Sequence, residues 1–500
     1  MDKKKSILNV CVSVASKIAT MILAILLTRV LIRTCGNGVN GLNALYVSII
    51  DFLSVTELGV GTAITFCMYK PIVEKDGEKV AALYGLFRRL YRIIGGVIFG
   101  AGLVLLPFLP LLAKDYTQLN VDLYGTFLLI LVSVVITYLF GARTALLNAY
   151  KNNYISTAIS SGGTILQYLL QMAVLWITGS FVGYLGCRIV SVLLRWLATE
   201  LLTRRRYAAI TNRREKLDKE TQSGLLKNIK AMFMHKIGTT LVNTTDSIII
   251  SYFAGVFARG NFSNYSMLMA GMTGVLRLVF TSLTSVIGHL YVEKSRQETL
   301  RCSELLHWGN FMLGSVCYLG YYAIADAFVG AWFGRELVAE KAVVAVLVVN
   351  GFVQFMRTNT LTFRDASGAF YYDRWKPLAE GVCNVVLSVI LVQYIGVVGV
   401  IAATVVTSLV ICHVVEPYVL YKHAFQLSPK KYYVKNYGLM VLFGGELWLM
   451  DCCLQRSESL WMGLVVNGGV SLLISLSACL CCVLLNQDLR RTVGGFLHKR

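Results

Sequence analysis

The chain has 500 residues, 56% of them hydrophobic, with six prolines and a formal net charge of +20. This length would fill about three soluble domains, but the apolar content is typical of one polytopic membrane bundle and excludes a soluble protein. The excess of Lys and Arg is spread over polar gaps between apolar segments. That distribution favours contact with membrane lipids, whose headgroups are anionic, and argues against a nucleic-acid partner.

The dominant pattern is a series of apolar segments that are each long enough to cross a bilayer. About 20 apolar residues span the hydrocarbon as a helix, because lipid offers no partner to free backbone N–H and C=O groups. The sequence therefore predicts an all-α membrane protein with about fourteen transmembrane helices. We expect them at residues 7–32, 41–66, 91–113, 123–148, 154–178, 181–202, 235–257, 262–289, 305–325, 339–362, 376–394, 396–420, 434–452 and 460–485.

The basic residues predict the orientation of these helices. Most of the 47 Lys and Arg fall in every second gap, at residues 3–5, 70–92, 151, 204–230, 294–301, 364–376, 422–435 and 490–500. The alternate gaps hold few cations: Arg33, Lys114, Arg259, Arg335, Lys341 and Arg456. Cation-rich loops translocate poorly, so we expect the first set, together with both termini, on the cytoplasmic side of the membrane.

The first twelve segments read as two copies of a six-helix unit. Gly41–Tyr46 (GLNALY) matches Gly260–Tyr265 (GNFSNY), and each motif enters an even-numbered helix that leads to a basic cytoplasmic loop. Parallel repeats of this kind are related by a pseudo-two-fold axis along the membrane normal. We predict an N-terminal lobe at 1–202, a cytoplasmic linker with an amphipathic segment at 203–234, a C-terminal lobe at 235–420, and two extra helices with a cytoplasmic tail at 421–500.

The sequence offers no catalytic or metal-binding motif. No His, Asp or Glu set has the spacing of a zinc site, and no nucleotide-binding glycine pattern follows a strand. Most of the 13 cysteines lie inside apolar segments, where a free thiol packs as a small apolar group. We therefore expect neither an enzyme nor a resident cofactor.

Charged residues inside the apolar segments are the main functional signal. A charge near the bilayer centre costs several kcal/mol, so those that occur usually face a wet cavity or a partner. Arginine and lysine in such a cavity suit an anionic substrate, above all a phosphate. The candidate substrate-binding residues are Lys17, Arg277, Arg357 and Arg143.

Ion pairing inside the membrane is the alternative interpretation of these cations. Lys17 can be neutralised by Glu57 or Asp246, and Arg277 by Glu380. The two interpretations are compatible, because a cavity that alternates its access can exchange ion-pair partners for substrate contacts.

A second polar set is rich in oxygen and predicts ion coupling. Asp246 lies among hydroxyl and amide residues, Glu380 and Asn384 are one helical turn apart, and Thr404 lies in the next segment. Such oxygens can hold Na⁺ or carry a proton. Hydrogen bonding between helices is the alternative role for these side chains.

Several motifs together resemble the polysaccharide flippases of the multidrug/oligosaccharidyl-lipid/polysaccharide exporter superfamily. They are Glu57–Ala63 (ELGVGTA), Met68–Pro71 (MYKP), Met232–Gly238 (MFMHKIG), Thr245–Ser251 (TDSIIIS), Asn264 with Tyr265, Phe363–Gly368 (FRDASG), Asn384 and Gly396–Gly399 (GVVG). The resemblance runs from the second to the twelfth predicted helix.

The resemblance implies two six-helix lobes around a cationic cavity with alternating access, in a bacterial cytoplasmic membrane. It implies a polyprenyl-diphosphate-linked oligosaccharide as cargo, moved from the cytoplasmic to the outer leaflet, with other polysaccharide-assembly proteins as further partners. The related lipid II flippases keep cavity cations on helices 1, 2 and 8, which Lys17 and Arg277 match in part. Helix 2 here has no central Arg. Some of those flippases bind a cation between helices 7, 11 and 12, where Asp246, Glu380, Asn384 and Thr404 lie.

Two other functions remain open at this point. A multidrug cation antiporter of the same superfamily favours an acidic or aromatic cavity, against which Lys17 and Arg277 argue. A membrane glycosyltransferase or polymerase needs acids at an outer active site and usually a sizeable outer loop, and the predicted outer loops are short.

Overall fold

The computed structural model describes residues 3–54, 60–213, 215, 217, 219–369, 372–454, 463–485 and 489–490. All regular elements in these ranges are helices. The chain forms two compact units, Met1–Gly260 and Asn261–Arg500.

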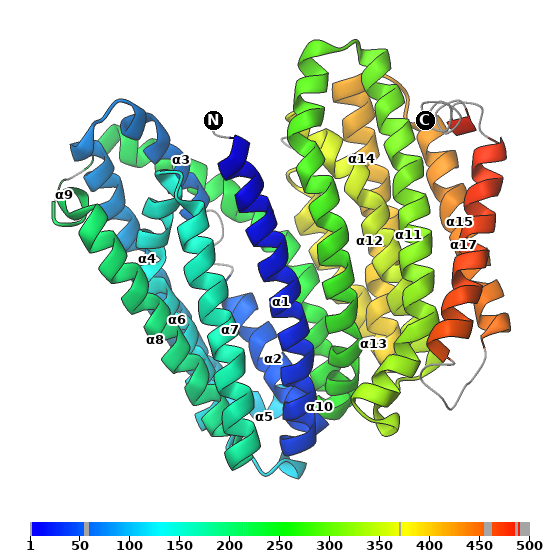
Figure 1. The fold of residues 1–500 in the computed structure, drawn as a ribbon, viewed down its shortest axis with the longest axis horizontal. Coiled ribbons are helices and arrows are strands. Elements are labelled where there is room, and N and C mark those ends of the chain that lie inside the picture. The colour runs from blue at the N-terminus through cyan, green and yellow to red at the C-terminus, as the bar shows by residue number, and fades with distance from the viewer. Residues whose placement is uncertain are drawn as a thin grey trace. The chain divides into compact units, whose positions relative to one another are not determined.

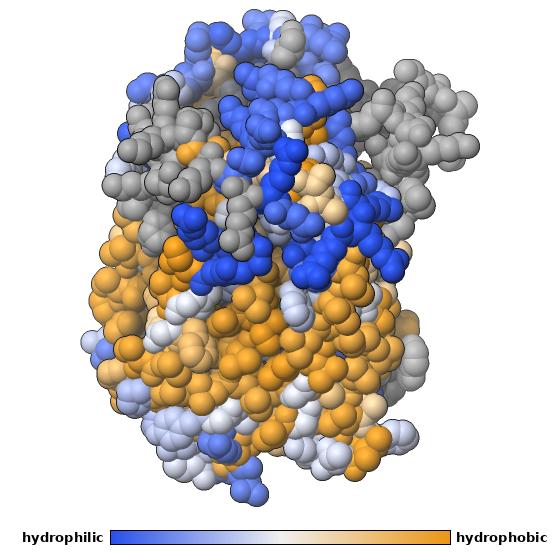
Figure 2. Space-filling model, turned by 90° about the vertical axis from the view of Figure 1, so that its left-hand side faces the viewer, coloured by the Kyte–Doolittle hydropathy of each residue, from blue (hydrophilic) through white to orange (hydrophobic). Residues whose placement is uncertain are grey.

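The described helices have the length and the surface of membrane-spanning elements. Ten of them are long and apolar enough to cross a bilayer. Large apolar side chains lie on their outer faces, such as Trp176 at 86% and Ile177 at 80% exposure. On the face drawn in Figure 2, a broad hydrophobic belt separates two hydrophilic ends. A soluble protein rarely exposes apolar patches of this extent, so the chain is a multi-pass helical membrane protein.

The first unit contains the helices that precede α10 and the part of α10 up to Gly260 (Figure 1). Polar residues cap several of them: the side chains of Asp76, Asp122 and Ser180 accept hydrogen bonds from backbone N–H groups in the first turns of α4, α6 and α8. The helices are α1 (Lys3–Cys35), α2 (Asn37–Leu53), α3 (Val60–Val73), α4 (Gly77–Leu105), α5 (Leu109–Leu112), α6 (Leu123–Ala149), α7 (Asn153–Thr178), α8 (Phe181–Arg206), α9 (Ala208–Thr211) and α10 (Lys219–Glu293).

The second unit contains the end of α10 and the helices that follow it. Ser295 and Glu298 form a capping box at the start of α11. A stack of Phe352 on Phe443, with ring centroids 3.7 Å apart, packs α12 against α15 in its core. The helices are α11 (Arg296–Trp332), α12 (Lys341–Ala366), α13 (Lys376–Thr407), α14 (His413–Val419), α15 (Lys430–Cys453) and α17 (Gly468–Leu485), with π-helical segments η6 (Ser408–Cys412), η7 (Leu420–Phe425) and η8 (Gly463–Asn467).

Two of the long helices contain a break in the backbone. In α10, Gly255 has φ 89° and ψ 167°, and in α13, Ile395 and Gly396 leave helical geometry, with φ 57° at Gly396. Glycine adopts these positive φ values without the steric cost that a side chain brings. The break that begins at Ile395 falls between 376–394 and 396–420, which the sequence predicts as separate helices. The break at Gly255 lies inside the predicted segment 235–257, close to its end and before the next predicted segment, 262–289.

The two matching motifs of the sequence make matching contacts. The Tyr46 hydroxyl donates to the Leu123 carbonyl oxygen at 2.7 Å, and Leu123 begins α6. The Tyr265 hydroxyl accepts from the Ala339 N–H at 3.2 Å, two residues before α12 begins. Both tyrosines are fully buried. Each therefore ties the helix that it lies on to the start of a later helix of its own unit.

Gly41, which opens the first motif, lies where another backbone passes very close. A Cβ atom there would lie 1.8 Å from the Val256 carbonyl oxygen and 2.8 Å from the Gly260 nitrogen. The turn at Gly255 is fixed nearby, because Lys114 donates from its Nζ to the Phe253 carbonyl at 3.0 Å. Any side chain at position 41 must push this turn away from α2.

We expect Gly41→Ala to lower the free energy of unfolding by about 3 kcal/mol, the upper end of overpacking costs, because the backbones must separate. The measurement is the melting temperature of the purified protein in detergent. Gly100→Ala in α4 is the matched control, because no atom lies within 4 Å of the added Cβ, and it should leave stability unchanged or raise it by up to about 1 kcal/mol. Equal melting of Gly41→Ala and the control contradicts the close approach.

Candidate functional site

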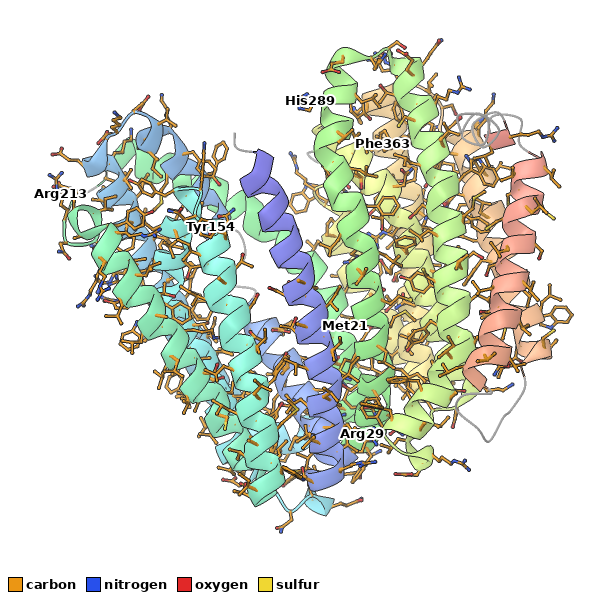
Figure 3. The ribbon with its side chains drawn as sticks, viewed as in Figure 1. Met21, Arg29, Tyr154, Arg213, His289 and Phe363 are labelled. Carbon is orange, nitrogen blue, oxygen red and sulfur yellow. The ribbon has the colours of Figure 1, made fainter. Side chains whose placement is uncertain are left out.

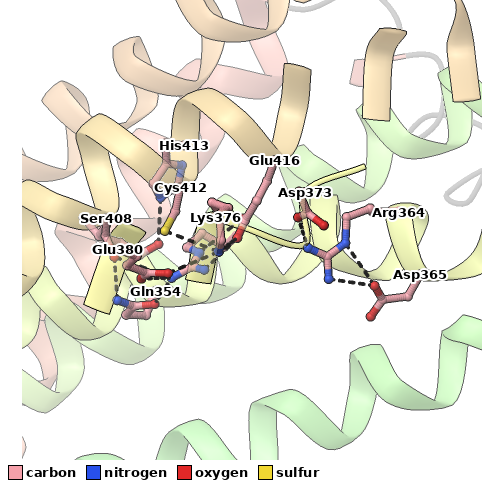
Figure 4. Close-up of polar contacts among 12 residues, drawn as sticks. Gln354, Arg364, Asp365, Asp373, Lys376, Glu380, Ser408, Cys412, His413 and Glu416 are labelled. Carbon is pink, nitrogen blue, oxygen red and sulfur yellow. Dashed lines mark hydrogen bonds and ion pairs between the residues drawn. The ribbon is translucent and has the colours of Figure 1, made fainter. Parts of the chain in front are cut away.

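Four charged side chains form a buried ion-pair cluster in the second unit, which we call the charge quartet: Arg357, Lys376, Glu380 and Glu416 (Figure 4). Arg357 lies 2.6 Å from Glu416 and 3.3 Å from Glu380. Lys376 lies 2.6 Å from Glu416 and 3.2 Å from Glu380. Each cation thus contacts both anions, and the quartet carries no net charge when all four groups are ionised.

Polar neighbours complete the hydrogen bonding of the quartet. Arg357 donates from Nη1 to the Gln354 side-chain oxygen at 2.6 Å, and the Gln354 amide donates to the Ser408 hydroxyl, also at 2.6 Å. The Lys376 ammonium lies 3.5 Å from the Cys412 sulfur. The four side chains of the quartet are at most 11% exposed, so these bonds replace the water that the charges lose.

A π-helical segment brings Glu416 into this cluster. Ser408–Cys412 is π-helical and is followed directly by α14, which carries Glu416. A π segment inserts an extra residue into the helix and turns the side chains that follow it, and such segments recur at functional sites. The chain thereby places Ser408, Cys412 and Glu416 against α12 and α13.

The quartet places Arg357, predicted to bind substrate, in direct contact with Glu380, predicted to couple a cation. The sequence offers Arg277 as a partner of Glu380, but in the structure Glu380 has two other partners, Arg357 and Lys376. Lys376 and Glu416 were not among the predicted site residues. The spacing of Lys376 and Glu380, one helical turn apart, was the available signal for that pair.

Arg143 is also held by an acid, in the first unit. It forms two contacts of 2.7 Å with the Glu200 carboxylate, from Nε and from Nη2, and it donates from Nη1 to the Thr203 hydroxyl at 3.0 Å. Arg204 contacts the same carboxylate at 2.6 Å. This bidentate pair joins α6 to α8, and the Arg143 side chain is only 9% exposed.

Lys17 and Arg277 differ from the other two predicted cations in their exposure and in their partners. Both side chains are exposed, and neither forms an ion pair with an acid in the part of the chain that the structure describes. Lys17 lies on α1 in the first unit, and Arg277 lies on α10 in the second. Glu57, considered as a partner of Lys17, lies outside the described residues. Of the four predicted substrate cations, these two are the ones without a carboxylate partner among the described residues, so each can pair with a bound anion.

Three of the predicted coupling residues lie within one helix of the second unit. The Asn384 amide donates to the Thr404 hydroxyl at 2.9 Å and links the two halves of α13 across the break at Gly396. Glu380 is one turn before Asn384 but engages the quartet. The buried Asn384 Oδ1 and Ser388 Oγ have no hydrogen-bond partner among the described residues.

These unpaired oxygens fit a cation site. Amide and hydroxyl oxygens suit a hard cation, and a buried oxygen without a partner costs about 1 to 3 kcal/mol. Asp246, the fourth predicted coupling residue, lies in the first unit within electrostatic range of Arg259. Among the described residues, no group of three or more His, Cys, Asp or Glu side chains is arranged to hold a metal ion.

The motif at Phe363–Gly368 has a structural role at the end of α12. The buried Arg364 contacts the Asp373 carboxylate and also pairs with Asp365 at 2.8 Å. Gly368, with φ 73°, allows the chain to turn there. Phe363 lies in an aromatic cluster at the same end of the unit (Figure 3).

The first unit carries a basic groove of about 1,210 Å³ between α4, α9 and the following segment. Arg88, Arg89, Arg92 and Arg213 line it, and Figure 3 shows Arg213 beside α9. A groove of this charge at a hydrophilic end of a membrane protein is suited to anionic lipid headgroups.

Known structures share this fold across most of the chain, although no family model and no curated protein matches the sequence. The lipid II flippase MurJ in an inward closed conformation matches with a TM-score of 0.70 and 11% identity, over 97% of this chain and 99% of that one. An inward-facing multidrug resistance MATE family transporter of the MOP superfamily matches with a TM-score of 0.64 and 13% identity, over 85% and 95%.

A third match is a MOP superfamily transporter from Pyrococcus furiosus, whose title reports reverse polarity of its binding pocket. Its TM-score is 0.56 at 14% identity, over 86% of this chain and 98% of that one. The chain therefore has the fold of the MOP superfamily transporters, as the motifs of the sequence predicted. These solved structures are of transporters.

We expect Glu416→Gln to lower the free energy of unfolding by about 3 to 5 kcal/mol, because it leaves two buried cations facing one carboxylate. The melting temperature in detergent measures this loss. The control is Glu74→Gln, which removes an exposed partner 3.8 Å from Lys70 and should cost no more than about 1 kcal/mol. Identical melting of the two variants contradicts a stabilising role for the quartet.

Proposed function

We propose that this protein is a flippase that moves a polyprenyl-diphosphate-linked oligosaccharide from the cytoplasmic to the outer leaflet. The observation that carries this proposal is the exposure of Lys17 and Arg277 on membrane-spanning helices without an acid in contact among the described residues. A cation in such a helix is costly unless it faces a wet cavity or an anion. The diphosphate supplies that anion.

The state of the other two cations sharpens this assignment. Arg143 and Arg357 are saturated by carboxylates and hold helices together. We therefore assign the direct substrate contacts to Lys17 and Arg277. We assign to Arg143 and Arg357 the role of holding neighbouring helices together within their units. Arg357 becomes a substrate contact only if the quartet opens during transport.

The length of the structural match supports a flippase over an antiporter. The MurJ match extends over 97% of this chain, whereas the MATE match extends over 85%. The additional length is what two helices beyond a twelve-helix core require, and α15 and α17 are such helices. Exposed cations on membrane-spanning helices also suit an anionic cargo better than a cationic drug.

We propose fourteen crossings in two six-helix lobes related by pseudo-two-fold symmetry, with α15 and α17 in addition. Ten described helices are long and apolar enough to cross the membrane. The breaks in α10 and α13 each add one crossing by dividing a long helix in two, α2 together with α3 adds a third, and α15 adds a fourth. The matching contacts of Tyr46 and Tyr265 support the repeat. Both termini are then cytoplasmic, in a bacterial cytoplasmic membrane. Membrane lipids and other polysaccharide-assembly proteins are the remaining partners.

The transport test is the sidedness of a polyprenyl-diphosphate oligosaccharide in cells depleted of the protein. We expect the lipid to accumulate in the cytoplasmic leaflet, and we expect Lys17→Ala/Arg277→Ala to restore less than a tenth of the export. The charge-conserving Lys17→Arg/Arg277→Lys is the matched control and should retain most of it. Membrane levels of each variant are measured in parallel.

Two outcomes would redirect the proposal. Normal export alongside raised sensitivity to cationic drugs favours the antiporter. Loss of polymer with a normal distribution of the lipid-linked precursor favours a glycosyltransferase or polymerase.

We further propose that a cation binds at Asn384, Ser388 and Thr404 and couples transport. Na⁺ should raise the melting temperature of the purified protein, because a ligand that binds only the folded state stabilises it, by about 2.7 kcal/mol at a hundredfold excess over Kd. Ser388→Ala, which removes a hydroxyl with no partner in the described structure, should abolish most of this effect. Choline chloride at equal ionic strength is the control. An equal shift in choline contradicts Na⁺ binding, and a shift with pH alone indicates a proton.

A further inference from the structure

A small polar cavity in the second unit shares no lining residue with the charge quartet or with the predicted cation site. It lies between the first turns of α11, the segment η7 and the first turns of α15. Its volume is about 160 Å³, and its walls include Glu304, His307, Tyr421, Lys431 and Lys435. The transport function proposed above uses none of these residues.

The inner wall of the cavity carries an imidazole that lacks partners. His307 is only 1% exposed, and neither of its ring nitrogens has a hydrogen-bond partner among the described residues. One face of the ring packs near Tyr432, with centroids 5.0 Å apart. Burying both nitrogens without a partner is costly, so a bound group or a water that forms a hydrogen bond there stabilises the site.

Two lysines one helical turn apart on α15 face the same cavity. The Lys435 ammonium lies 4.6 Å from the centroid of the Trp308 ring, and it donates a long hydrogen bond, 3.4 Å, to the Glu304 carbonyl oxygen. Neither Lys431 nor Lys435 forms an ion pair in the described part of the chain. Glu304 is the one acid of the cavity wall, so cations outnumber anions there.

The charge and the size of the cavity together define the ligand. The helix α15 begins at Lys430, and the dipole of this long helix places partial positive charge at that end, beside the lysines. The volume is well below the roughly 300 to 1,000 Å³ of pockets for drug-sized molecules, so neither an oligosaccharide nor a drug fits. A tetrahedral phosphate group with a few waters fits, and Lys is a common phosphate ligand.

The helix α15 also carries an exposed apolar stripe. Val434, Val441 and Trp448 are spaced by seven residues and are 78%, 75% and 67% exposed. Seven residues are close to two helical turns, so the three side chains lie along one side of α15. A phospholipid whose phosphate enters the cavity can lay an acyl chain on this stripe.

We propose that this cavity is a binding site for a phosphate group, in which His307, Lys431 and Lys435 contact the phosphate oxygens. The lysines supply the charge, and His307 supplies a hydrogen bond from the buried side. A phospholipid headgroup and free phosphate share this chemistry, and the apolar stripe favours the phospholipid as the source.

The test uses the full-length protein purified in detergent, with its melting temperature as the readout. Short-chain phosphatidylglycerol, short-chain phosphatidylcholine and inorganic phosphate are titrated separately, with chloride at matched ionic strength. We expect phosphatidylglycerol to raise the melting temperature in a saturable way. In Lys431→Gln/Lys435→Gln, the concentration for half of the effect should rise at least tenfold. Lys430→Gln, one residue outside the cavity wall, is the matched control and should behave as the wild type.

His307→Phe tests the same site without changing its formal charge. It should weaken the response to phosphatidylglycerol while the protein without ligand melts at the same or a higher temperature, because an unpaired polar group has been removed. A saturable response to inorganic phosphate that the lysine pair also controls supports the site and assigns free phosphate as its ligand. Equal responses of the lysine variant and the wild type to all three ligands overturn the proposal.

Discussion

Neutralisation of buried charge is the constraint on which the second unit depends. An isolated charge inside a membrane protein costs several kcal/mol, and removal of one partner from a buried pair costs about as much. The quartet meets this constraint by giving each cation two carboxylates and each carboxylate two cations. Because its members come from α12, α13 and α14, charge balance also fixes how these three helices pack.

The same constraint separates structural cations from available ones. Arg143 meets it through Glu200, and Arg357 meets it through the quartet. Lys17 and Arg277 have no such acid among the described residues, and their exposure leaves water or a bound anion as their partner. Four cations that look alike in sequence thus divide into two roles.

Breaks and π segments are the points where these helices depart from regularity. Gly255 and Gly396 take positive φ values, and Asn384 bonds Thr404 across the second break. The unpaired oxygens of Asn384 and Ser388 lie in the helix that contains this break. Irregular backbone and unpaired polar atoms therefore occur together, as in transporters that bind ions at discontinuous helices.

The sequence by itself determined the class of protein and the positions of most of its long helices. Hydrophobic length suffices for this, because the bilayer imposes it on each segment independently. Only the tertiary structure decided the partners of the charges. Glu380 pairs with Arg357 and Lys376, although Arg277 was the partner considered from sequence, and His307 shares a cavity with Lys435 across 128 residues of chain. Such pairings depend on which helix faces come together, and spacing along one helix does not encode contacts between helices.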